Sequence, residues 1–245
     1  MNSGIYTSYS GLRAQMESLE MLANNLANVN TTGFKEQRAF YRLMNRDVGA
    51  GPGHMLDAVV NNHAVLAETA LDLSNGSLMQ TGRELDLALV GDGFLVVQTR
   101  NGLRLSRNGG LFKDPRSQLV TADGFPVLGE KGPILLGGGA VEITEKGDVL
   151  VDKSPVDRLR LVTVPDAIYL TREGNSLLVP PQAAPDPLPA RDASVRQGYL
   201  EQSNVNPMLS TVRMIEIMRH FEAIQKSMNL ISNVMDAKSI EKLSR

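Results

Sequence analysis

Two long amphipathic segments, one at each end of the 245-residue chain, constrain its fold more than any other feature. In the first segment, apolar residues recur every seven positions, and further apolar side chains fill the positions between them. This spacing is typical of a helix with a narrow, coiled-coil-like apolar seam rather than a broad globular face. The residues of the first seam are Ile5, Leu12, Leu19 and Leu26.

The first segment ends in residues that do not favour helix. Asn28 and residues 30–32 have low helix propensity, and Gly33 can adopt the left-handed conformation that closes many helices. Phe34 then offers an apolar anchor just beyond the end. We therefore predict a helix of about 28 residues, roughly 42 Å long, within an assembly segment that spans residues 1–35.

A second stripe of this helix carries amide side chains. Asn24 and Asn28 lie one turn apart on the side opposite the seam, and Asn25 lies at the flank of the seam. Because asparagine is a poor choice for an exposed helix, we interpret this stripe as a contact surface, which would let the helix touch two partners at once. In the alternative interpretation, the asparagines are solvated and only weaken the helix before its end.

The second amphipathic segment occupies residues 207–245. Asn206 and Pro207 are typical of an N-cap and a first helical residue. Methionine is frequent along the seam; its flexible side chain suits contacts with several slightly different neighbours, although it equally fills an uneven core. The residues of the second seam are Met214, Ile217 or Met218, Phe221, Ile224, Met228, Ile231 and Met235.

Neither helix can bury enough apolar surface by itself to offset the backbone entropy lost on ordering it. We therefore expect both segments to be largely unstructured in the isolated monomer and to order on assembly. A chain with two such ends is predicted to join copies or relatives of itself.

Between the helices the pattern changes to that of β-structure. Residues 36–64 predict a long connecting loop with some local structure. Residues 65–179 contain short alternating runs separated by turns, among them a hairpin turn at Asn101-Gly102, and predict a central antiparallel β-barrel or sandwich-like domain. Residues 180–206 begin with a proline-rich stretch and predict an extended return segment. The predicted fold class is α+β, with a mainly β body and a discontinuous helical domain from both ends.

The composition excludes several functional classes. A net charge of −2 gives no field that would attract nucleic acid, and no apolar stretch reaches the roughly 18 residues that direct membrane insertion needs. The chain has no cysteine, and its three histidines lack metal-binding spacing. Asp86 and Asp92 are interpreted as exposed carboxylates at a strand edge rather than paired acids. We therefore predict no enzyme, no cofactor and no metal site.

Several motifs resemble those of the bacterial flagellar rod and hook proteins. Residues 23–34 are similar to the N-terminal signature of that family, Gly91-Asp92-Gly93-Phe94 and Arg107-Asn108-Gly109 to its middle region, and residues 198–206 to the segment before its C-terminal helix. Within the family, the opening residues 4–11 and the modest length are most similar to the proximal rod type, with the distal rod type as the alternative.

Two positions depart from the family pattern. Leu105 stands where an aromatic residue is usual, and Ser117 where an Asp-x-x-Gly turn usually has glycine. Both concern local strand and turn structure.

The resemblance implies a structural subunit that assembles with itself and with neighbouring rod proteins, including the distal rod protein. It also implies export through the flagellar type III apparatus without a cleaved signal peptide, and a position in the rod that spans the periplasm; it leaves contact with peptidoglycan open. The opening residues agree, since they lack a charged region followed by an apolar one. Two alternatives are an oligomeric β-domain that binds a ligand or a surface, and a periplasmic hydrolase, for which the sequence offers no candidate constellation.

Overall fold

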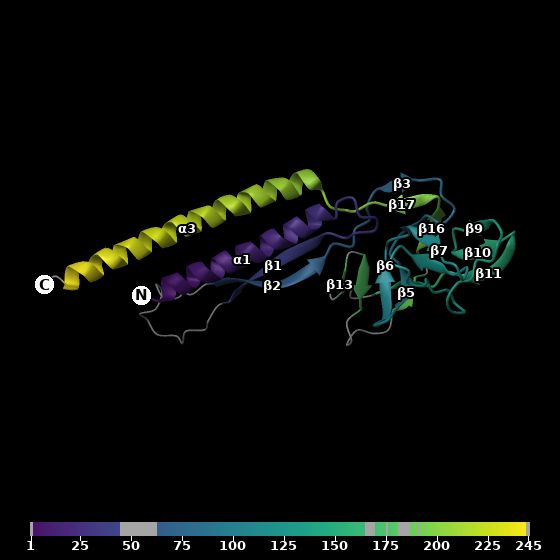
Figure 1. The fold of residues 1–245 in the computed structure, drawn as a ribbon, viewed down its shortest axis with the longest axis horizontal. Helices are drawn as coiled ribbons and strands as arrows, with labels where there is room; N and C mark the ends of the chain where they lie inside the picture. Colours follow the sequence, from purple (N-terminus) through teal and green to yellow (C-terminus); the bar gives the residue numbers. More distant parts are fainter. Residues whose placement is uncertain are drawn as a thin grey trace. The chain divides into compact units, whose positions relative to one another are not determined.

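The computed structural model places the chain in two compact units, each assembled from segments distant in sequence (Figure 1). It describes residues 2–44, 63–164, 170–174, 176–180, 187–190 and 192–243, and the side chains of these residues except those of 2–8, 40–44, 63–68 and 231–243. The described residues of the first unit fall within 1–26, 37–69 and 207–245, and those of the second within 27–36 and 70–206.

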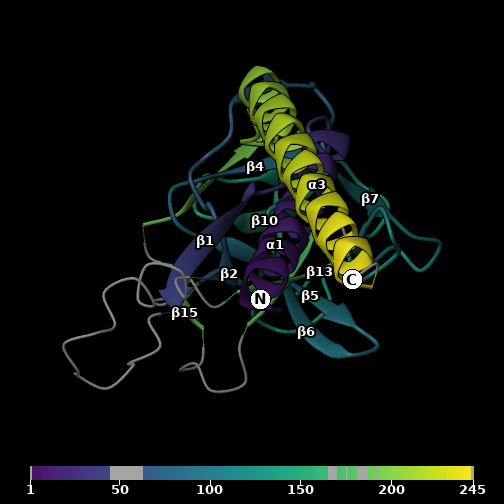
Figure 2. The same ribbon diagram turned by 90° about the vertical axis from the view of Figure 1, so that its left-hand side faces the viewer.

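The first unit contains both helices, α1 (Asn2–Ala27) and α3 (Pro207–Leu243), and a two-stranded sheet of β1 (Gln37–Met44) and β2 (His63–Leu71). The helices run in opposite directions, and the two strands lie beside α1 (Figures 1 and 2). The start of α1 and the end of α3 therefore lie at the same end of this unit. The two predicted helices are confirmed, and α1 ends close to the predicted position.

β1 corrects the prediction that residues 36–64 form a connecting loop. Residues 37–44 pair with β2, and their sequence includes Phe40 and Tyr41, residue types that are enriched in strands. The glycines of residues 49–53 and the asparagines at 61 and 62, which had suggested a loop, lie outside the described residues.

The second unit is a body of short strands, and every strand pairing defined in it is antiparallel. Its largest sheet has the order β13-β14-β6-β5-β12-β15; a three-stranded sheet has the order β11-β10-β9, and the remaining pairs are β16-β4, β17-β3 and β7-β8. The strands are β3 (Leu78–Gln80), β4 (Leu87–Val90), β5 (Phe94–Thr99), β6 (Gly102–Ser106), β7 (Leu111–Lys113), β8 (Leu119–Thr121), β9 (Val141–Ile143), β10 (Asp148–Val151), β11 (Ser154–Arg158), β12 (Leu161–Thr163), β13 (Thr171–Glu173), β14 (Leu177–Val179), β15 (Leu188–Pro189), β16 (Ser194–Gln197) and β17 (Tyr199–Glu201).

The mainly β, α+β fold class is confirmed, but the described strands form no closed barrel. The six-stranded sheet is open, with β13 and β15 at its edges. Its central strand β5 is buried on both faces: Phe94 and Val96 enter one apolar cluster, and Leu95 enters another. Short strands with frequent turns thus pair into several small sheets around two cores, which is why the body does not curl into a single barrel.

The hairpin between β5 and β6 is confirmed, with a shifted turn. Thr99 pairs with Gly102, so Arg100 and Asn101 form the two-residue turn and Gly102, at φ 104°, opens β6. Ser117 has a φ of 63°, so it adopts the left-handed conformation that the usual glycine of this turn would provide.

Leu105 is buried in the same apolar cluster as Phe94. Residues 180–206, predicted as an extended return segment, also contain strands of the β-unit. β15, β16 and β17 fall within them, and Val195 and Leu200 are buried, because this stretch supplies pairing strands to β12, β4 and β3.

Candidate assembly surface

α1 buries a face different from its predicted seam. The buried residues recur at helical spacing, so they share one side of the helix. That side includes two small residues and an amide, so it shows no repeat of large apolar residues in the sequence. The buried residues of this face are Ala14, Ser18, Leu22 and Asn25.

The predicted seam of α1 is left partly open. Leu12, Leu19 and Leu26 are only half-buried, and Tyr9 and Met16, which lie between the leucines, are 64% and 51% exposed. The side chain of Ile5 lies outside the described residues. An apolar stripe of this length that remains accessible in a single chain is available for a partner.

The predicted seam of α3 is its least exposed side. Its members are half-buried, whereas the residues between them are mostly exposed, and Ile217 rather than Met218 belongs to the stripe. The side chains of Ile231 and Met235 lie outside the described residues. The half-buried members are Met214, Ile217, Phe221, Ile224 and Met228.

A groove of about 450 Å³ separates the two stripes. Phe221 enters it from α3, and one rim carries Arg13 and Glu17, whose Nε and Oε1 atoms are 3.0 Å apart. The helices therefore face each other across a space that their own side chains do not fill. The groove is lined by Tyr9, Leu12, Arg13, Met16, Glu17, Glu20 and Phe221.

Asn25 and Asn28, both proposed as contact residues, form hydrogen bonds with their own chain. Asn25 is buried, its Nδ2 donates to the carbonyl of Gln37 (2.8 Å), and its Oδ1 accepts from the Gln37 N–H (3.0 Å), so it holds the start of β1. Asn28 is buried and accepts a hydrogen bond from the Thr31 hydroxyl (3.1 Å). Asn24 is exposed, and a contact between this stripe and a partner stays a prediction.

Gly33 adopts the predicted left-handed conformation, but in a different place from the helix end. Its φ is 68°, it lies beyond the last residue of α1, Ala27, and its N–H donates to the carbonyl of Glu201 (2.8 Å). A Cβ at this position would lie 2.4 Å from the carbonyl carbon of Arg107. Position 33 therefore requires glycine for two reasons, the left-handed backbone conformation and the lack of room for a Cβ atom.

Phe34 is buried as the predicted anchor. The guanidinium of Arg172 lies 4.0 Å from the centre of its ring and also donates to the carbonyl of Lys35. Both contacts belong to the second unit.

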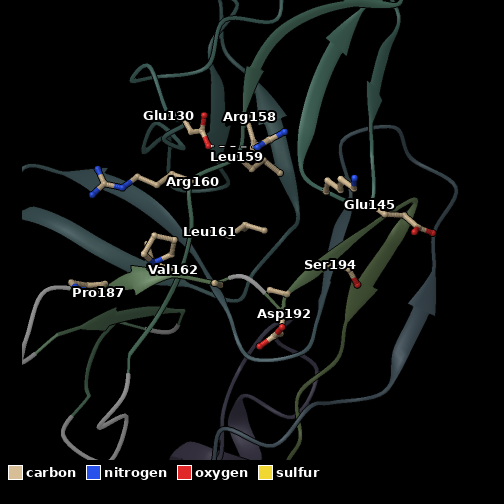
Figure 3. A pocket seen from close by; sticks show the side chains of 14 residues that line it. Glu130, Glu145, Arg158, Leu159, Arg160, Leu161, Val162, Pro187, Asp192 and Ser194 are labelled. Atoms are coloured by element: carbon tan, nitrogen blue, oxygen red, sulfur yellow. Dashed lines mark ion pairs between the residues drawn. The ribbon is translucent and has the colours of Figure 1, made fainter.

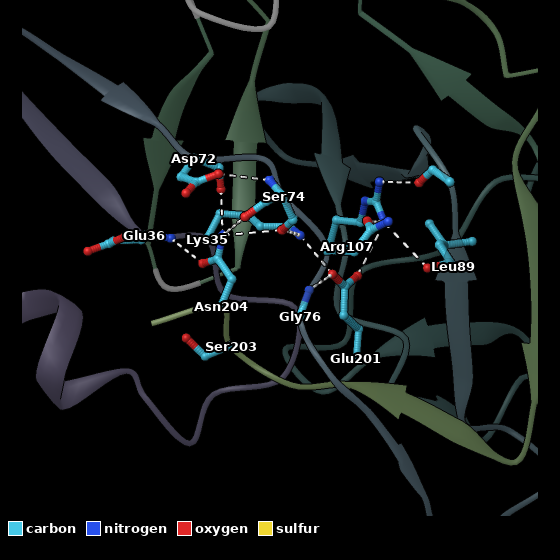
Figure 4. Close-up of polar contacts among 12 residues, drawn as sticks. Lys35, Glu36, Asp72, Ser74, Gly76, Leu89, Arg107, Glu201, Ser203 and Asn204 are labelled. Atoms are coloured by element: carbon cyan, nitrogen blue, oxygen red, sulfur yellow. Dashed lines mark hydrogen bonds and ion pairs between the residues drawn. The ribbon is translucent and has the colours of Figure 1, made fainter. Parts of the chain in front are cut away.

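A buried ion triad lies next to this anchor (Figure 4). Lys35 Nζ is 2.7 Å from Glu201 Oε1, and Arg107 Nη1 is 3.3 Å from Glu201 Oε2; all three side chains are almost inaccessible. Burial lowers the pKa of Lys35 below its usual 10.5 and the Arg107 charge acts in the same direction, while Glu201 opposes the shift. The sequence does not predict this triad, since nothing in the spacing of the three residues pairs them.

Backbone groups complete the triad. The Gly76 N–H donates to Glu201 Oε1 (2.9 Å), Lys35 Nζ donates to the carbonyl of Ser74 (2.7 Å), and Arg107 Nη2 donates to the carbonyl of Gly91 (2.6 Å). Two buried cations are thus matched by one carboxylate and several carbonyl dipoles.

Asn204 fixes the same region from the other end of the chain (Figure 4). Its Oδ1 accepts from the Glu36 N–H (2.7 Å), and its Nδ2 donates to the carbonyl of Asp72 (2.8 Å). The residues that follow α1 in sequence and those that precede α3 are therefore both folded into the β-unit.

A second cavity, of about 690 Å³, lies in the β-unit (Figure 3). Two of its charged lining residues form an ion pair, with Arg158 Nη1 3.9 Å from Glu130 Oε1. Arg158 also pairs with Asp148, which does not line the cavity, with Nε 2.6 Å from Oδ1. The hydrogen bond from Arg158 lowers the pKa of Asp148.

The interpretation of Asp86 as an exposed carboxylate is wrong, because its side chain is buried and its Oδ1 lies 3.6 Å from Arg83 Nη1. Asp92 is exposed, as expected. Within the described part of the chain, no group of three or more histidine or acidic residues could hold a metal ion. The same residues include no helix long and apolar enough to cross a membrane.

The chain resembles known proteins over its whole length. Residues 5–35 match the family described as "Flagella basal body rod protein", and residues 196–239 match "Flagellar basal body rod FlgEFG protein C-terminal". It is 33% identical to the flagellar basal-body rod protein FlgF of Caulobacter vibrioides, over 100% of this chain and 99% of that protein, and 34% identical to FlgF of Rhizobium meliloti, over 99% and 98%. It is 31% identical to the rod protein FlgG of Buchnera aphidicola subsp. Schizaphis graminum, over 94% and 95%.

Proposed function

The chain belongs to the flagellar basal-body rod protein family, whose members are structural and not enzymatic, and we propose that its two terminal helices are the surface by which it joins neighbouring subunits of the rod. The accessible seam of α1 carries this proposal. Leu12, Leu19 and Leu26 are half-buried, and Tyr9 and Met16 are exposed, in a helix whose opposite side is already covered by its own chain.

The neighbours in this proposal are further copies of the chain and the other rod proteins, including the distal rod protein. The similarity to FlgF proteins over the whole chain favours the proximal rod. Export through the flagellar type III apparatus without cleavage, and a place where the rod crosses the periplasm, belong to the same proposal. A discontinuous coiled coil made by the two seams with helices of neighbouring subunits would be the assembled form.

A distal rod subunit is the second candidate. It is favoured by the 31% identity to a FlgG protein over 94% of the chain. Deletion of the gene separates the two candidates: basal bodies whose rods stop near the base indicate the proximal position, and rods that are nearly complete but carry no hook indicate the distal one.

The assembly surface is tested by Leu26→Asp. A carboxylate in a packed helix seam is costly, so we expect loss of swimming and of rod incorporation at normal protein level. Ala27→Asp is the matched control, because Ala27 is exposed and places the same charge at the same end of α1. Equal swimming by the two variants, with equal amounts of protein in purified basal bodies, would refute the seam as the assembly surface.

A further inference from the structure

α3 carries a second apolar stripe on the side away from its seam. Met208, Val212 and Ile215 follow one another at four- and three-residue steps, so they share one helix face. They are 78%, 49% and 47% exposed, which leaves the whole stripe accessible. Arg219, also exposed, continues this face by one further turn.

The α1 side of the groove has a matching period. Tyr9, Leu12 and Met16 follow one another at three- and four-residue steps, and the exposed Glu20 continues that face by one turn. Each stripe therefore consists of three apolar or aromatic residues followed by one charged residue at its C-terminal end. Each stripe spans roughly 16 Å of helix.

We infer that the outer stripe of α3 in one copy of the chain occupies the groove between α1 and α3 of the next copy. This inference rests on the proposed function and names the partner of that surface: a second copy, inserted through Met208, Val212 and Ile215. The same chain supplies both the groove and the side chains that fit it. A single row of apolar side chains flanked by polar ones matches a narrow groove with a charged rim.

The order of the residues is compatible with an antiparallel register. In this register Met16 lies opposite Val212, Leu12 opposite Ile215, and Tyr9 opposite Arg219, where its ring meets a cation. Glu20 lies beside the first turn of the incoming α3. That turn contains no acidic residue, so Glu20 would complement the positive end of its helix dipole.

The antiparallel register also fixes how copies add. Since α1 and α3 of one chain already run in opposite directions, an incoming α3 that is antiparallel to α1 comes from a copy in the same orientation. The groove and the outer stripe are different surfaces, so each copy can use both at once. A heterologous contact of this kind continues from copy to copy, into a ring or an open helical filament, instead of ending with a symmetric pair.

Engineered cysteines test the contact directly, because the chain has no cysteine of its own. Met16→Cys and Val212→Cys are prepared as separate full-length proteins of different tag length, mixed at a concentration at which the protein associates, and oxidised. Disulfides need their Cα atoms within about 7 Å. We expect the Met16→Cys and Val212→Cys mixture to give a heterodimer as its main product on a non-reducing gel.

Two mixtures serve as matched controls. Met16→Cys with Ile215→Cys reports the parallel register, and Met16→Cys with Met214→Cys reports insertion of the α3 seam in place of the outer stripe. Each is expected to give much less heterodimer than the Val212→Cys mixture. If either control mixture gives more heterodimer than the Val212→Cys mixture while association is unchanged, this inference is wrong, but the proposed function is not contradicted. Sedimentation of the unmodified chain as a monomer, with no cross-linked product in any mixture, overturns self-association itself.

Discussion

Lys35 and Glu201, 166 positions apart in the sequence, form a buried ion pair with Nζ and Oε1 2.7 Å apart. One follows α1 in sequence and the other precedes α3, so a single contact ties both helix junctions into the β-unit. Arg107 shares the same carboxylate through Oε2, at 3.3 Å. Glu201 is thus the only acidic side chain of a triad that has two cations.

The asymmetry of this triad predicts unequal effects of neutralising its members. Glu201→Gln leaves two buried cations without their counter-charge and should lower the free energy of unfolding by about 3–5 kcal/mol. Lys35→Met should cost less, because Glu201 keeps Arg107 and the Gly76 N–H. Urea unfolding followed by circular dichroism measures both losses.

Glu142→Gln is the control for the charge change alone, because Glu142 is exposed. Its free energy of unfolding should stay within about 0.5 kcal/mol of that of the unsubstituted chain. Equal losses for Glu201→Gln and Lys35→Met would contradict the description of the triad as two cations that share one carboxylate.

The lowered pKa of Lys35 predicts a pH dependence. Between that lowered pKa and the ordinary value of 10.5, the unfolded chain binds more protons at this site than the folded one, so stability rises with pH across this window. The free energy of unfolding of the original chain, relative to that of Lys35→Met, should therefore increase as the pH is raised from neutral towards 10.5. Subtracting the Lys35→Met titration removes the contribution of other groups. A difference that falls with pH would show that Glu201 outweighs burial.

Gly33→Ala should destabilise the β-unit through two effects. A left-handed backbone costs an L residue about 1–2 kcal/mol, and overpacking against the Arg107–Asn108 peptide adds about 1–3 kcal/mol. Gly124 is the matched control: its φ is 79°, but a Cβ there would meet nothing within 4 Å, so Gly124→Ala carries only the conformational cost. Urea midpoints compare the two variants. A midpoint for Gly33→Ala as high as that for Gly124→Ala would refute the close packing of Gly33.

The helices were predictable from the sequence because their signal is local. The seven-residue repeat through Leu12, Leu19 and Leu26 and the Asn206-Pro207 start are complete within a few turns of chain. The covered side of α1 was not predictable, because Ala14 and Ser18 carry no apolar repeat and are buried only by what the tertiary fold brings against them. β1 was missed for a similar reason, since its partner β2 is separated from it by residues 45–62.

The contacts of the residues that flank the helices were even less predictable from the sequence. The family signature singled out Gly33 and Phe34, but the role of this glycine depends on the peptide of Arg107, which reaches it only in the folded chain. Lys35 and Glu201 carry no mutual signal, because an ion pair across 166 positions has no period. Local patterns therefore predict the two terminal helices, whereas long-range packing determines the contacts of the residues that flank them.

The two helices should gain order when the chain assembles. The α1 seam is only half-buried in one chain, and the groove beside Phe221 is unfilled, so a single copy provides few contacts to offset the entropy of ordering the helices. Far-ultraviolet circular dichroism of the full-length protein should show rising helix content as the concentration passes from the monomeric to the associated range. Leu26→Asp should stay at the low value throughout, whereas Ala27→Asp should follow the original chain. Full helix content in a dilute monomer would mean that α1 and α3 stabilise each other without a neighbour, and the open seam would then have to be explained by something other than assembly.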